Sequence, residues 1–136
     1  MLYGRADRYA IMQSVEQARG LRIGSYNGDS RGQWLADHGM NVEFVQNDES
    51  NPKKLMLDRI DLWANSTRSS GPMPARLGLT GKVVPLLTFH QAKLYLACNR
   101  ALPEPVAARM NAALHDMEMD GTYRAIELRF DYLQAP

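Results

Sequence analysis

The sequence lacks several features that would point to particular classes of protein. Its 136 residues include one cysteine, Cys98, which excludes an intrachain disulfide framework and a metal site built from several cysteines. Sixteen lysines and arginines face fifteen aspartates and glutamates, so a net charge of +1 provides no overall attraction for nucleic acid or an anionic membrane. No apolar run approaches the roughly 20 residues that a membrane-spanning helix needs. The three histidines show no metal-ligand spacing, and we expect neither a metal nor another cofactor.

What the sequence does contain is typical of a globular domain. Hydrophobic residues make up 45% of the chain and charged residues 23%. Short apolar runs alternate with amphipathic stretches, which predicts an α/β fold with a mainly parallel sheet flanked by helices. In such sheets, ligands bind at the carboxyl ends of the strands.

The predicted elements alternate along most of the chain. The predicted strands cover residues 21–26, 41–45, 60–64, 83–89 and 93–98, and the predicted helices cover 14–20, 30–38, 51–59, 73–77, 103–120 and 122–133. We expect Asn51 to cap the helix that Pro52 begins. The apolar run 93–98 suggests a strand buried on both faces, which would also bury the thiol of Cys98.

The sharpest local motif lies between the first of these strands and the following helix, at residues 28–32. It matches Gly-x-Ser-x-Gly, the nucleophile elbow of α/β hydrolases, in which Ser30 would need a histidine as its base. His90 ends an extended segment and suits that role better than His38 or His115. No aspartate lies three residues before any histidine, so the Asp-x-x-His pattern of a related esterase class is missing.

A structural interpretation of the same segment needs no catalysis. Gly28 would make a tight turn, Asp29 or Ser30 would cap the helix, and Gly32 would permit close packing. We favour this interpretation, because glycine and capping residues are common where a strand turns into a helix. The helix start could also bind a ligand anion. The carboxylate of Asp29 would occupy that positive end, however, so a polar or cationic ligand group fits better there.

Asp61 falls inside the predicted strand 60–64. An ionised carboxylate in that position must be paired or lie near the edge of the sheet. It could bind a ligand ammonium group, or it could pair locally with Arg59, Lys54 or Lys53, and we favour the local pairing.

Several segments of the sequence carry short motifs whose order along the chain is typical of one protein family. They are carried by residues 21–28, 55–63, 94–99, 110–117 and 120–126. This order resembles the bacterial extracellular solute-binding proteins of family 3, the amino-acid-type periplasmic receptors of ABC importers. In that family a strand and a glycine turn precede a leucine-rich helix, and a hinge strand and an Asn-x-Ala-Leu…Asp-Gly-Thr-Tyr…Ile helix pair come last.

The resemblance implies a lobe of a type II periplasmic binding protein, which closes on a small ligand by bending at a hinge. Residues 1–97 resemble the second, ligand-binding lobe, with hinge strands at about 2–6 and 93–97. Residues 98–136 resemble the C-terminal helical segment that packs on the first lobe. The main part of that first lobe has no counterpart here, so we expect the chain to be incomplete. The first-lobe arginine that holds the ligand carboxylate in many members is not expected in it.

The expected cleft residues follow the first and third predicted strands. They are Tyr26, Asn27, Gly28, Asp29, Ser30, Asn65 and Ser66. The family's threonine or serine after the turn glycine falls at Asp29, and the carboxylate that often grips the ligand ammonium falls at Ser66. Neither usual amino-acid contact of this lobe is therefore present in its standard form, and a different polar ligand is an alternative. The resemblance implies non-catalytic binding of an amino acid or a similar small polar solute, with hinge closure as the mechanism.

The expected partners follow from the same resemblance. A full receptor would meet the membrane subunits of an ABC importer, and no nucleic acid is expected. Residues 103–133 carry an apolar stripe that includes Val106, Met110, Leu114 and Met117, so we expect a homo-oligomer or a domain swap through this region. Residues 1–8 have neither the apolar core nor the cleavage site of a signal peptide. A periplasmic location is expected if the parent receptor is exported.

Overall fold

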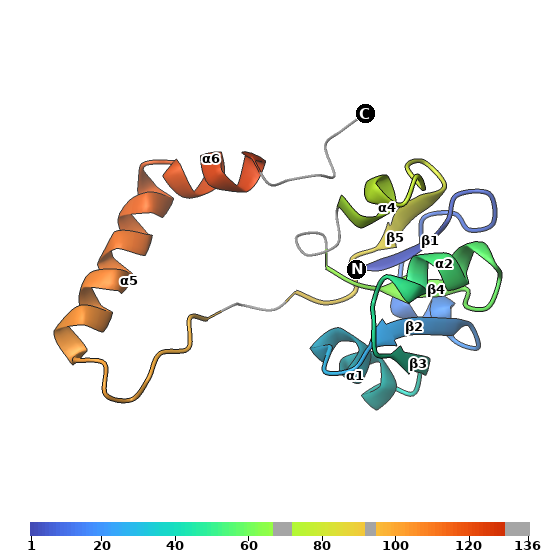
Figure 1. The fold of residues 1–136 in the computed structure, drawn as a ribbon, viewed down its shortest axis with the longest axis horizontal. Helices are drawn as coiled ribbons and strands as arrows, with labels where there is room; N and C mark the ends of the chain where they lie inside the picture. Colours follow the sequence, from blue (N-terminus) through green and yellow to red (C-terminus); the bar gives the residue numbers. More distant parts are fainter. Residues whose placement is uncertain (67–71, 92–94, 130–136) are drawn as a thin grey trace. The chain divides into compact units, whose positions relative to one another are not determined.

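The computed structural model describes residues 1–66, 72–91 and 95–129. The chain divides into two compact units, Met1–Gln91 and Ala92–Pro136 (Figure 1). The first unit contains β1 (Leu2–Arg5), the 3-10 helix η1 (Val15–Ala18), β2 (Arg22–Tyr26), α1 (Ser30–Asp37), β3 (Asn41–Val45), α2 (Ser50–Met56), β4 (Leu62–Ala64), α4 (Pro72–Arg76) and β5 (Val83–Leu87). The second contains α5 (Glu104–Met119) and α6 (Thr122–Arg129).

The five strands form one sheet in the order β3-β2-β4-β1-β5. β2 pairs in parallel with both β3 and β4, whereas β1 pairs antiparallel with β4 and β5. The predicted α/β lobe is confirmed, and its sheet is mixed. The parallel part is confined to β3, β2 and β4, because α1 and α2 provide the crossovers that parallel strands require.

This topology gives the sheet two different edges. At one edge, which we call the carboxyl edge, β2, β3 and β4 end, β1 begins and β5 ends. Leu2 pairs with both Ala64 and Leu87, so the start of β1 and the end of β5 lie beside the end of β4. At the opposite edge, the amino edge, β2, β3 and β4 begin and β1 ends. Ligand sites of open α/β sheets lie at the carboxyl edge.

The core is split between the two faces of the sheet. Leu2, Ile23 and Leu62 belong to one buried cluster, which includes Leu35 from α1. The neighbouring residues Tyr3 and Trp63 belong to the other, together with residues from α2. Successive side chains of a strand point to opposite faces, so adjacent residues divide between the clusters. Helices on both faces therefore bury the sheet.

Two sequence-based predictions about local structure are wrong. α2 begins at Ser50, so Asn51 and Pro52 lie within its first turn and Asn51 does not cap it. Proline is tolerated there because the first-turn N–H groups have no helical partner. Residues 95–98 form no strand and are exposed, and the thiol of Cys98 is exposed as well. Residues 93 and 94 lie outside the described residues.

The second unit confirms the predicted helix pair over the residues that the structure describes. α5 starts after Pro103, and a turn at Gly121, which has a φ of 81°, separates it from α6. The predicted continuation of α6 to Leu133 lies outside the described residues. Neither helix buries a residue completely. Among the described residues, no helix is both long enough and apolar enough to cross a bilayer.

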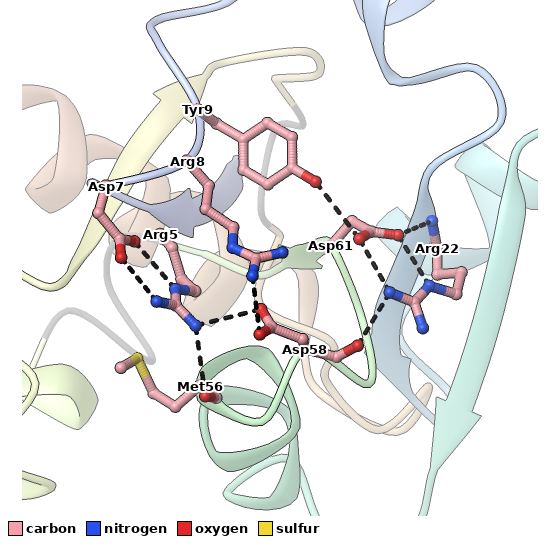
Figure 2. A network of polar contacts seen from close by, with 8 residues as sticks. All are labelled: Arg5, Asp7, Arg8, Tyr9, Arg22, Met56, Asp58 and Asp61. Atoms are coloured by element: carbon pink, nitrogen blue, oxygen red, sulfur yellow. Dashed lines mark hydrogen bonds and ion pairs between the residues drawn. The ribbon is translucent and has the colours of Figure 1, made fainter.

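A network of ion pairs occupies the amino edge (Figure 2). The guanidinium of Arg22 donates to Asp61 through Nε at 2.8 Å and Nη2 at 2.9 Å, and the backbone N–H of Arg22 donates to the same carboxylate at 2.9 Å. Arg5 and Arg8 both contact Asp58, at 3.1 and 2.9 Å. These contacts fasten the chain after β1 and the start of β2 to the loop before β4.

The ion-pair network shows that Asp61 has a structural role. It lies just before β4 and pairs with Arg22, not with the nearby Arg59, Lys54 or Lys53 that the sequence suggested. Because the residue is at the amino edge, it does not face the strand ends where a ligand would bind. The hydrogen bonds from Arg22 lower the pKa of Asp61 from 3.8 to about 2.

We predict that Asp61→Asn lowers the free energy of unfolding by about 1 kcal/mol at neutral pH, since the partly exposed pair is screened by solvent. The folded-state pKa lies below the unfolded one, so this stabilisation is present above pH 4 and is lost as the pH falls toward 2. Urea unfolding followed by tryptophan fluorescence measures the difference, because both tryptophans, Trp34 and Trp63, lie in the first unit.

Asp37→Asn is the control, because this exposed carboxylate accepts one side-chain hydrogen bond, from Gln33. It should change the unfolding free energy little at any pH. A difference between Asp61→Asn and the unaltered chain that persists undiminished at pH 2 would contradict the assignment.

Candidate ligand-binding site

Polar segments from three strands meet at the carboxyl edge. Residues 27–31 follow β2, residues 46–49 follow β3, and residues 65–66 follow β4. The parallel pairing of β2 with β3 and β4 brings these segments together, and the backbone N–H of Asn27 donates to Val45 O at 2.9 Å. The structure therefore places the predicted cleft residues at one edge of the sheet.

The predicted cleft residues differ in what they present to solvent. Asn27, Gly28 and Ser30 are exposed, and Tyr26 and Ser66 are half-buried. Asp29 and Asn65 are buried, with 3% and 0% of their surface exposed. The exposed members can contact a solute directly, whereas the buried pair shapes the loops that carry them.

Asp29 caps α1, as the structural interpretation of the motif predicted. Its Oδ1 accepts from the backbone N–H of Arg31 at 3.1 Å, and its Oδ2 accepts from the hydroxyl of Ser25 at 2.9 Å. The Nε of Arg31 lies 2.9 Å from Oδ1 and supplies the compensating charge. A carboxylate with these partners can be buried at a helix start, where the helix dipole also favours it.

The two glycines of the motif have different structural roles: one allows a turn of the backbone, and the other allows close packing of a helix against the sheet. Gly28 has a φ of 84°, in the left-handed region that the turn from β2 to α1 requires. Gly32 lets α1 approach the sheet: a Cβ at this position would lie 2.4 Å from Ser25 Oγ and 2.8 Å from Phe44 Cε1. The spacing of the glycines thus has a structural cause.

The described residues do not assemble a serine hydrolase around Ser30. Within the described parts of the chain, its hydroxyl makes no hydrogen bond to a histidine. The ring of His90 stacks on Trp34 with 5.4 Å between centroids, and His38 stacks on the same indole at 3.8 Å. The best base that the sequence offered is therefore part of an aromatic cluster.

The carboxylate of Asp48 accepts hydrogen bonds from several buried groups at the carboxyl edge, and the sequence analysis did not predict this role. Its Oδ1 accepts from the indole N–H of Trp63 at 2.9 Å and from Nδ2 of Asn51 at 3.0 Å. Its Oδ2 accepts from Nδ2 of Asn65. All three donors belong to residues with no exposed surface. One side chain after β3 thereby satisfies buried groups of α2, β4 and the loop after β4.

Asn51 and Asn65 complete this framework. Nδ2 of Asn51 also donates to the backbone carbonyl of Ser25 at 3.1 Å, which joins α2 to β2. Oδ1 of Asn65 accepts from the N–H of Ser66 at 2.6 Å, and the backbone of Asn65 exchanges hydrogen bonds with Met1. The run Gln46-Asn47-Asp48 after β3 is the signal that could have revealed the third segment, because it follows the same strand-end rule as the other two.

A buried tyrosine lies under the edge. Tyr3 packs its ring against Trp63, with 5.3 Å between centroids, and its hydroxyl has no hydrogen-bond partner within the described residues. Burial raises the pKa of Tyr3 to about 12, and the positive charge of Arg31 opposes that shift. Tyr3 is therefore neutral at physiological pH.

Other parts of the described chain offer weaker candidates. A depression at the amino edge is lined by Ala6, Asp7, Met56, Gly81 and Lys82. Its acidic side chain is held by Arg5 at 2.6 Å, so the depression does not gather converging polar groups. Among the described residues, no group of three histidines, cysteines or carboxylates could hold a metal ion.

The fold is that of a lobe of the type II periplasmic binding proteins. Comparisons with protein families and with curated proteins give no match. Comparison with solved structures does. A histidine kinase sensor domain with similarity to periplasmic binding proteins matches 95% of the chain at 18% identity, with a TM-score of 0.71. An ancestral arginine-binding protein bound to arginine matches 95% at 21% identity, with a TM-score of 0.67.

These matches show the fold and its extent. The chain spans 57% and 58% of the length of those two structures, which is little more than half. Domain 2 from TmArgBP, solved as a separate domain, matches 66% of the chain at 13% identity, with a TM-score of 0.57, and 97% of that domain is covered. Its coverage supports an independently folded lobe as the unit of resemblance.

We predict that Asp48→Ala lowers the free energy of unfolding by about 2–4 kcal/mol, because it removes the acceptor of the Trp63 indole N–H and one acceptor each of the amides of Asn51 and Asn65. The indole N–H resonance of Trp63 should shift as its hydrogen bond is lost. Denaturant unfolding and a proton–nitrogen NMR spectrum measure both effects.

Asp48→Asn is the matched variant, since it can keep the oxygen that faces Trp63 and Asn51. We expect it to cost less than the alanine and to leave the indole resonance close to its original position. Equal costs for both variants, with an unmoved indole signal in each, would show that this carboxylate does not organise the edge.

Proposed function

We propose that the chain is the ligand-binding lobe of a solute-binding receptor that serves an ABC importer, and that it binds an amino acid or a similar small polar solute without catalysis. The observation that carries this proposal is the convergence of three polar strand-end segments on the carboxyl edge of a lobe with this fold. Tyr26, Asn27, Gly28, Ser30 and Ser66 are the proposed contact residues, and Asp29 and Asn65 hold them in place.

The course of the chain supports closure about a hinge. β1 begins and β5 ends side by side at the carboxyl edge, where Leu2 pairs with Leu87. Of the hinge strands expected at about residues 2–6 and 93–97, residues 2–5 form β1 of the sheet, and residues 95–97 form no strand. The proposed hinge therefore lies in the chain that enters β1 and leaves β5, on the same side as the ligand. A solute held between the lobes then stabilises the closed state over the open one, because it contacts both lobes only when they are closed.

The rigid framework beneath the edge fits a receptor of this kind. The buried side chains of Asp29, Asn51 and Asn65 each hydrogen-bond to the backbone or to neighbouring side chains, so these contacts hold the loops in place without a ligand. Binding then costs little ordering of the protein, and the binding free energy goes into closure.

We predict that L-arginine, L-glutamine or L-glutamate at millimolar concentration perturbs backbone NMR resonances of residues 26–31 and 65–66. The amino edge, including Arg22 and Asp61, should not respond, because it lies at the other end of the strands. Titration of the isotope-labelled chain measures this, and the double variant Asn27→Ala and Ser30→Ala should weaken any observed binding several-fold.

Asn41→Ala is the control, since this exposed side chain lies at the start of β3, at the amino edge. Perturbations that gather at the amino edge, or a titration in which none of the three amino acids moves any residue of the carboxyl edge, would refute the proposal.

The proposed oligomer rests on α5. Its apolar stripe recurs at helical spacing, and Val106, Met110 and Leu114 are 41%, 37% and 47% exposed. Val106, Met110 and Leu114 stand four residues apart, so they share one face of the helix. We propose that this face packs against a second copy of the chain, as an oligomer or a domain swap through residues 103–133.

We predict that the chain sediments as a dimer and that Leu114→Glu shifts it to a monomer, because a charge on the apolar face cannot be buried without a partner. Asn111→Glu adds the same charge on a polar, exposed position of α5 and should leave the dimer intact. A monomer for the unaltered chain at high concentration would end this proposal.

A further inference from the structure

We propose that Arg31 is an anion-binding residue of the carboxyl edge, so that the solute carries a carboxylate or phosphate group where it meets this lobe. This inference rests on the proposed function and names the chemical class of its ligand. It reverses the expectation that Asp29 would favour a cationic group at the start of α1.

The guanidinium of Arg31 is mostly covered yet uses few of its donors. Its side chain is 24% exposed, and its Nε lies 2.9 Å from Asp29 Oδ1. Nε is itself buried and, for want of alignment, donates no hydrogen bond within the described residues. In the same parts of the chain, the two terminal nitrogens also donate none. A guanidinium has five N–H donors in a planar fork, so this one retains most of its capacity.

The acidic side chains nearby are already committed. The carboxylate of Asp29 is 1% exposed and accepts from Ser25 and from the backbone of Arg31. The carboxylate of Asp48 faces the buried donors of the framework. Glu49 pairs with Arg76 at 2.8 Å. The side chain of Arg31 is more exposed than that of Asp29, so the charge that this pair presents to solvent is positive.

The chemistry of the guanidinium selects the ligand group. A planar fork binds a carboxylate or phosphate with two parallel hydrogen bonds, and such charge-assisted bonds are stronger than neutral ones. The exposed hydroxyl of Ser30, the neighbouring residue, can add a donor to the same oxygens.

The experiment compares three probes on the isotope-labelled chain: succinate, inorganic phosphate and the diamine putrescine. We expect succinate, phosphate or both to shift the side-chain Nε–Hε resonance of Arg31, and putrescine to leave it unmoved. Which of the two anions binds more tightly separates a carboxylate site from a phosphate site. A preference of this edge for putrescine, or no response to either anion, would overturn the inference.

Variants test whether Arg31 itself binds the anion. Arg31→Gln should weaken binding about tenfold, and Arg31→Lys should keep the fold but bind less tightly than arginine, because it lacks the fork. Arg59→Gln removes the same charge from an exposed position before β4, at the amino edge, and should bind like the unaltered chain. Anion binding that survives Arg31→Gln unchanged would reject the assignment.

Asp29→Asn keeps the test decisive if Arg31→Gln does not fold. Asparagine caps helices as well as aspartate does, so α1 should remain intact. If Arg31 binds anions, loss of the competing carboxylate should tighten binding by about threefold. If Arg31 serves only to neutralise Asp29, binding should not tighten. Failure of the proposed function looks different, because then L-glutamine also leaves the carboxyl edge unperturbed.

Discussion

The half-buried carboxylate of Asp48 makes the contacts on which the arrangement of the carboxyl edge depends. It stands in the loop after β3 and accepts hydrogen bonds from Trp63, Asn51 and Asn65, which belong to three other parts of the first unit. Each of these donors is removed from water, so each needs an acceptor inside the protein. The loops that carry the proposed contact residues are consequently fixed by the same interactions that complete the core.

The two edges of the sheet carry different kinds of polar chemistry. At the amino edge, arginines and aspartates pair with one another across the starts of β2 and β4, and the network is satisfied internally (Figure 2). At the carboxyl edge, Asp48 accepts from several buried donors, whereas Asn27, Ser30 and Arg31 retain hydrogen-bonding capacity toward solvent. The topology causes this division, because it gathers the ends of β2, β3, β4 and β5 at one edge and their starts at the other.

The sequence was sufficient for much of the site because its signals are local. A left-handed glycine, a capping aspartate and a glycine against the sheet are each determined by neighbours in the chain, so the segment from Gly28 to Gly32 could be interpreted correctly. Asp48 could not be assigned in this way, because its partners Asn51, Trp63 and Asn65 are brought together only by the packing of α2 and β4. The strand predicted over 93–98 failed over its described residues for a related reason: an apolar run forms a strand when a neighbouring strand is there to pair with it.

By itself, the sequence determined the alternation of strands and helices, the turn chemistry between β2 and α1, and the residue types that follow each strand, since short-range sterics and hydrogen bonding set all three. Only the tertiary structure decided which polar side chains are consumed by the fold and which face solvent. In the folded chain, Asp61 pairs with Arg22, and the buried side chain of Asn51 bonds to the backbone of Ser25. The carboxylate of Asp29 is buried and pairs with Arg31. The physical reason is that burial and charge pairing depend on distances between residues that are remote in sequence, and folding alone sets those distances.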